Sequence, residues 1–110
     1  MAMSKEDMIS AMRAGEFCVN NARVLCTINI LYTKYVPLKT IRYALPELDE
    51  QDISKSVNFL AEEEYIHVRT INEHAAASIA DWQLADLEAK VSGKGIRLLA
   101  GKIKDDCVSV

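Results

Sequence analysis

"ISKSVNFLAEEEYIHVRTI", residues 53–71, contains the change of period that decides the fold. In its first part, apolar residues recur at i, i+4 and i+7 on one helical face: Ile53, Val57 and Leu60. From Tyr65 the pattern alternates within a run of β-favouring residues, which indicates a strand. The stretch therefore predicts a helix over 51–64 that runs directly into a strand over 65–71.

Upstream of this helix, a second apolar stripe lies between two prolines. Pro37 suits the first turn of a helix over 37–45, where a missing N–H costs nothing. Pro46 then ends that helix. Its buried stripe is predicted to be Leu38, Ile41 and Leu45.

The first 35 residues predict two further helices. Ser4 followed by Asp7 resembles a helix cap, and the first helix is predicted to end near Gly15. A second helix is predicted from Ala22 to Tyr35, with a core-facing stripe of Leu25, Ile28, Tyr32 and Tyr35.

Downstream, "LEAKV", residues 87–91, alternates again and is predicted to pair with the strand at 65–71. A competing interpretation makes residues 75–90 a helix, because Ala, Leu and Glu favour helices. We favour the strand, because a strand at 65–71 needs a partner. Ser92 is then predicted to cap a last helix, whose apolar stripe is Ile96, Leu99 and Ile103.

The glycine-rich stretch "KVSGKGIRLLAG" does not match a phosphate-binding loop. No glycine lies five positions before Gly93, and no Ser or Thr follows Lys94. Cys18, Cys26 and Cys107 show no metal-site spacing, so we expect idle thiols, no metal and no cofactor. No nucleophile and base are arranged as an enzyme would need, so we expect a protein that is not an enzyme.

Composition indicates one folded domain, because 50% of the 110 residues are hydrophobic. No apolar run approaches the roughly 20 residues of a membrane span. The N-terminus lacks the apolar core of a signal peptide, so we expect a cytoplasmic protein. The net charge of −3 is uneven, since residues 49–73 hold two basic and seven acidic side chains.

The succession of short helices, two alternating strands and "VSGKGIRLL" resembles the winged helix-turn-helix superfamily over residues 22–103. Many of its members open the last helix with a Ser/Thr-x-x-Gly turn, which Ser92 and Gly95 match. The chain's size and C-terminal segment are also similar to regulator-like proteins of Mu-like prophages. The resemblance implies a mainly α fold with a small β-ribbon. It divides the single domain into an N-terminal helical extension (1–21), a helix-turn-helix plus wing (22–91), and a C-terminal helix and tail (92–110).

The resemblance further implies a transcriptional regulator that binds double-stranded DNA, with the helix at 51–64 in the major groove. We expect a homodimer built from the terminal helices, because Met8, Met12, Leu99 and Ile103 leave more apolar surface than one small core can cover. The expected DNA-contacting residues are Lys39, Arg42, Gln51, Ser54, Lys55, Asn58 and Arg69. Acidic residues at both ends of that helix oppose phosphate binding, and the wing loop at 72–81 carries no Lys or Arg. A winged-helix module that binds a protein partner without DNA therefore stays open as the alternative.

Overall fold

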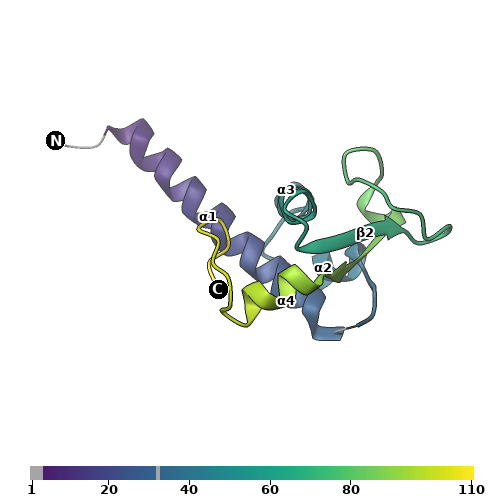
Figure 1. Cartoon of the computed structure of the whole chain (residues 1–110). Coiled ribbons are helices and arrows are strands. Elements are labelled where there is room, and N and C mark those ends of the chain that lie inside the picture. Colours follow the sequence, from purple (N-terminus) through teal and green to yellow (C-terminus); the bar gives the residue numbers. More distant parts are fainter. Residues whose placement is uncertain (1–3, 32) are drawn as a thin grey trace.

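The computed structural model describes residues 4–31 and 33–110, which form four α-helices and a three-stranded antiparallel sheet (Figure 1). This confirms a mainly helical chain with a small β-ribbon. The helices are α1 (Lys5–Ile28), α2 (Leu38–Ala44), α3 (Glu50–Glu62) and α4 (Gly93–Leu99). The molecule measures 54 × 31 × 22 Å. It is elongated because the N-terminal half of α1 projects from the body.

The predicted break near Gly15 is wrong, because α1 continues through it as one helix of 24 residues. Ser4 caps the helix as expected, with its hydroxyl accepting from the Asp7 N–H at 3.1 Å. Gly15 is exposed, and a glycine there costs only about 1 kcal/mol relative to alanine, which the flanking helix-forming residues tolerate.

The predicted helix from Ala22 to Tyr35 is also wrong at its end. Helix α1 stops at Ile28, and a 3₁₀ turn at Asn29–Leu31 follows. Tyr32 lies outside the described residues, and Tyr35 lies beyond the helix. Of the predicted stripe, Leu25 and Ile28 are fully buried.

Helices α2 and α3 follow the sequence prediction closely. The α2 stripe of Leu38, Ile41 and Leu45 and the α3 stripe of Ile53, Val57 and Leu60 are all buried. One difference is strand β1 (Val36–Pro37), which takes the place of the helical first turn expected at Pro37. A strand of two residues has no alternation from which it could be predicted.

Strands β2 (Ile66–Thr70) and β3 (Leu87–Val91) confirm the predicted ribbon, and the competing helix over 75–90 is wrong. The sheet order is β1-β3-β2, with every neighbouring pair antiparallel. The connection between β2 and β3 holds only a 3₁₀ turn at Leu84–Asp86. The helix propensity of the alanines in this segment is therefore outweighed by tertiary pairing, because Ala76 forms an antiparallel bridge with Arg69 of β2.

Helix α4 is rotated relative to the prediction. Ser92 caps it, accepting from the Gly95 N–H at 3.1 Å, but the fully buried side chain is Leu98. Of the predicted stripe, Ile96 is 50% exposed, whereas Leu99 and Ile103 are partly buried against the core, with Ile103 beyond the end of the helix. The cause is Gly95, because a side chain there would collide with the Tyr65 carbonyl oxygen. This close approach turns the face of residues 95 and 98 toward the core.

Lys94, from the glycine-rich stretch, has a structural contact. Its Nζ donates to the Glu63 carbonyl at 3.0 Å and lies 4.9 Å from the centre of the Tyr65 ring. It thus ties the start of α4 to the end of α3. In the part of the chain that the structure describes, no helix has the length and apolar character to cross a membrane.

Candidate nucleic-acid interface

Helix α3 presents a polar face directly opposite its buried stripe. Gln51, Lys55, Asn58 and Glu62 are exposed and recur at i, i+4, i+7 and i+11. Ser54 is half-buried at the border of this face. Gln51, Lys55 and Asn58 are therefore exposed as the sequence predicted, and together with Glu62 we call them the α3 face.

The N-terminal end of α3 is strongly acidic because carboxylates cap it. Asp49 accepts from the Asp52 N–H at 2.7 Å, and Asp52 accepts from the Asp49 N–H at 3.3 Å. This reciprocal capping box, with Glu50 in the same turn, stabilises the helix through its dipole. The same three carboxylates repel phosphate at this end of the α3 face.

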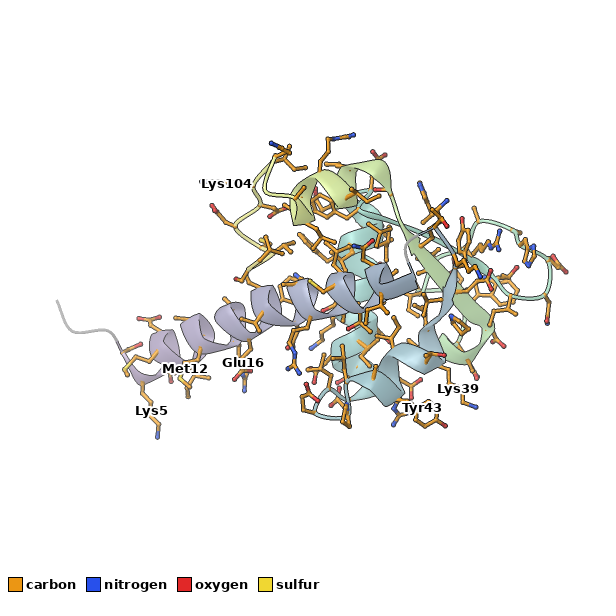
Figure 2. The ribbon with its side chains drawn as sticks, turned by 90° about the horizontal axis from the view of Figure 1, so that it is seen from below. Lys5, Met12, Glu16, Lys39, Tyr43 and Lys104 are labelled. Carbon is orange, nitrogen blue, oxygen red and sulfur yellow. The ribbon has the colours of Figure 1, made fainter. Side chains whose placement is uncertain are left out.

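Helix α2 places Lys39, Arg42 and Tyr43 on its exposed side, and Figure 2 shows Lys39 and Tyr43 on the same side of the molecule. The Arg42 guanidinium pairs with the Glu50 carboxylate, with Nη1 and Oε2 3.3 Å apart. About half of each side chain is exposed, so a DNA phosphate could reach Arg42 but would have to displace Glu50 from it. Lys39 makes no ion pair within the described residues.

Arg69 is not positioned as the sequence predicted. Its Nε donates to the Glu88 carboxylate at 2.6 Å, and its guanidinium lies 3.5 Å from the centre of the Tyr35 ring. The ion pair forms because Arg69 and Glu88 are direct cross-strand partners. Only 27% of the arginine side chain is exposed. Arg69 therefore braces the sheet, and a phosphate could bind it only in competition with Glu88.

The wing between β2 and β3 is anchored at Thr70 but carries no cation. The Thr70 N–H donates to the Ala75 carbonyl at 2.9 Å, and the His74 N–H donates to the Thr70 carbonyl at 3.0 Å. His74 has a left-handed backbone with φ of 56°. Trp82 is 48% exposed near the far end of the connection. The wing thus presents an aromatic ring and carboxylates but no lysine or arginine.

Two features of this surface were missed by the sequence analysis. Tyr43 is 74% exposed beside the cations of α2, and no periodicity distinguishes it from other solvent-facing residues. The other is Arg13, which lines a hollow between α1 and α3 with Asp52 and Lys55. Only an unbroken α1 brings Arg13 there, so the wrongly predicted break at Gly15 hid it.

The projecting half of α1 carries apolar side chains that contact no core. Every residue from 4 to 16 is exposed, and Figure 2 shows Met12 on this projection. Met8, Met12 and Val19 are 52%, 65% and 46% exposed. Their spacings of four and seven place them on one helical face, opposite the buried residues of α1. We call these three residues the α1 stripe.

Comparison with family models, curated proteins and solved structures finds no match to this chain. Among the described residues, no group of three or more His, Cys, Asp or Glu could hold a metal ion. Cys18 and Cys107 are half-buried, and Cys26 is exposed.

Proposed function

We propose that this chain is a winged-helix protein that binds double-stranded DNA through the α3 face. The support is the element order, in which α1, β1, α2, α3, β2 and β3 follow one another and β3 lies between the other two strands. In such a unit, the helix equivalent to α3 is the one that enters the major groove. The observation that carries the proposal is that the polar face of α3 is left uncovered by the rest of the described chain.

The chemistry of the α3 face suits base contacts. Gln51 and Asn58 carry side-chain amides, which pair bidentately with adenine in the major groove. Lys55 donates to guanine or to a phosphate. Lys39 and Tyr43 of α2 would contact the phosphate backbone, because the first helix of the pair crosses the backbone.

The electrostatics predict weak binding by each copy. Arg69 is bound to Glu88, Arg42 is paired with Glu50, and the wing adds no cation. With Lys39 and Lys55 as the principal phosphate contacts, the affinity of one copy falls with salt by a slope of only about −2 in log units. DNA binding at physiological salt therefore requires two copies on neighbouring half-sites.

The α1 stripe supports a homodimer. A solvated helix of this length is marginal without packing, yet the projection carries exposed methionines instead of a fully polar surface. Gly15 lies on the same face between Met12 and Val19, with open space around it. With no side chain at this position, a helix of a second copy would approach the α1 stripe closely.

The test is a binding titration of the full chain on labelled genomic DNA fragments, from low to physiological salt. Lys55→Ala should weaken binding to all fragments and reduce the salt slope by about one unit if it contacts a phosphate. Asn58→Ala should relax preference at one base pair, at about 1–3 kcal/mol. Lys102→Ala, an exposed cation beyond α4, is the matched control and should change neither.

The alternative is a winged-helix module that binds a protein partner. The exposed Trp82 on an acidic wing favours it, because aromatic residues are enriched at protein interfaces and carboxylates repel DNA. If no fragment binds even at low salt, the DNA proposal fails. A pull-down in which Trp82→Ala loses the captured protein would then support the alternative.

A further inference from the structure

The C-terminal segment after α4 turns back and lies against α1 (Figure 1). Gly101, with φ of +76°, makes the turn. The Ser109 N–H then donates to the Cys18 carbonyl at 3.1 Å, and the Asn21 side-chain amide donates to the Cys107 carbonyl at 2.9 Å. Val108, between these two contacts, is only 3% exposed. The last residues are therefore seated on one turn of α1.

These contacts bring Cys18 and Cys107 together from opposite ends of the sequence. Burial raises the pKa of the Cys107 thiol, and the neighbouring Cys18 thiol and Asp105 carboxylate raise it further. Asp105 also accepts from the Cys107 N–H at 2.8 Å, which fixes the backbone that carries this thiol. The two thiols are near neighbours on segments that the hydrogen bonds hold in place.

We propose that Cys18 and Cys107 are a disulfide-forming pair, which a small-molecule disulfide such as oxidised glutathione closes within one chain. The proposal is independent of DNA binding, because neither cysteine lies on the α3 face. The exposed Cys26 lies eight residues from Cys18 along helix α1, about 12 Å away along the helix axis, and serves as the internal comparison.

The chemistry proceeds by two thiol–disulfide exchanges. The Cys18 thiolate attacks one sulfur of oxidised glutathione, forming a mixed disulfide and releasing one glutathione. Cys107 then loses its proton and attacks the Cys18 sulfur, forming the intramolecular bond and releasing the second glutathione. Two protein thiols are oxidised, one glutathione disulfide is reduced, and both protein protons end on the released glutathiones. Cys107 is assigned the second step because its raised pKa lowers the fraction of its thiolate.

The Cys18–Cys107 disulfide would form at the point where the projecting half of α1 joins the body of the protein. Residues 4–16 are exposed, whereas Cys18 and Asn21 contact the tail. The tail is also tied to the end of α3, because the Tyr65 hydroxyl donates to Asp105 at 2.6 Å. The oxidised chain therefore holds α1, the tail and the end of α3 as one unit, while the reduced chain relies on Val108 and a few hydrogen bonds.

The experiment treats the full Cys26→Ser chain with oxidised glutathione and then maps its disulfides by mass spectrometry. The expected product is a single chain, with no covalent link to a second copy, that has lost two hydrogen atoms, has no alkylatable thiol, and yields one peptide pair linked through residues 18 and 107. In urea, oxidation should shift the unfolding midpoint upward, and amide exchange in residues 105–110 should slow. Cys107→Ser should stop instead at a stable glutathione adduct on Cys18.

Two outcomes would overturn the proposal. One is a Cys26→Ser chain that carries persistent glutathione adducts on both remaining cysteines without an internal bond. The other is oxidation that yields only covalent dimers. Because the Cys26→Ser chain keeps both Cys18 and Cys107, the result does not depend on whether Cys18 or Cys107 variants fold.

Discussion

Replacing Arg69 is the clearest test of whether this residue has a structural role or contacts DNA. Arg69→Ala removes the hydrogen-bonded ion pair with Glu88, whose carboxylate is only 12% exposed, and the contact with Tyr35. A hydrogen bond to a charged group contributes about 1.5–3 kcal/mol, and an exposed cation–π contact about 0.5–1 kcal/mol. Because the arginine keeps some access to water, we take the lower part of the range and expect a loss of about 2–3 kcal/mol.

The assay is urea unfolding of Arg69→Ala beside His67→Ala. His67 lies on the same strand and side but is exposed, so its loss should change stability by only about 0.5 kcal/mol. Arg69→Met combined with Glu88→Gln should recover part of the loss, because a neutral pair leaves no buried charge unpartnered. If Arg69→Ala unfolds like the unchanged protein while lowering the salt slope of DNA binding, Arg69 contacts phosphate and the reasoning is refuted.

Three further predictions concern packing and assembly. Leu98→Ala should cost about 2–5 kcal/mol of unfolding free energy, whereas Ile96→Ala should cost far less, and equal losses in urea would contradict the rotation of α4. Lysine at both Met8 and Met12 should convert a dimer of the 12.3 kDa chain into a monomer in sedimentation, and an unchanged dimer would exclude the α1 stripe. Burial and the hydrogen bond to a carboxylate raise the pKa of Tyr65, so its stabilising effect is present below about pH 10 and is lost progressively above it. Tyr65→Phe should flatten this alkaline loss, and an unaltered pH profile of unfolding would reject that cause.

The elements that the sequence predicted best are those whose signal is local. The residues of the buried stripe of α3, and those of the alternation after Tyr65, each lie within a few positions of one another. Helix α4 was predicted to exist but was rotated, because its orientation depends on the approach of Gly95 to the Tyr65 backbone. Such a contact between segments 30 positions apart leaves no periodic signal.

The continuity of α1 was the larger error, and it had consequences for the site. A glycine ends a helix only when the chain must turn there, and at Gly15 open solvent imposes no turn. A helix broken at Gly15 would not hold Met8 and Met12 on the same face as Val19. The predicted break therefore gave no indication of the α1 stripe. It also left Arg13 out of the surface beside Lys55.

The charges of the candidate site show why residue types alone overestimate DNA contacts. Residue type and expected exposure predict DNA contacts equally for Lys39, Lys55, Arg42 and Arg69. In the structure, however, both arginines are paired with carboxylates of the same chain. The pairing of Arg69 follows from the strand register, in which Glu88 is its direct partner, so it becomes visible only once β2 and β3 are aligned. Lys39 and Lys55 lie near the acidic capping box of α3. One copy therefore makes few phosphate contacts of the kind that release counterions from DNA. A second copy doubles those contacts without altering the α3 face. For this reason the DNA proposal depends on the α1 stripe: a strictly monomeric chain that bound one site tightly at physiological salt would contradict the electrostatic argument.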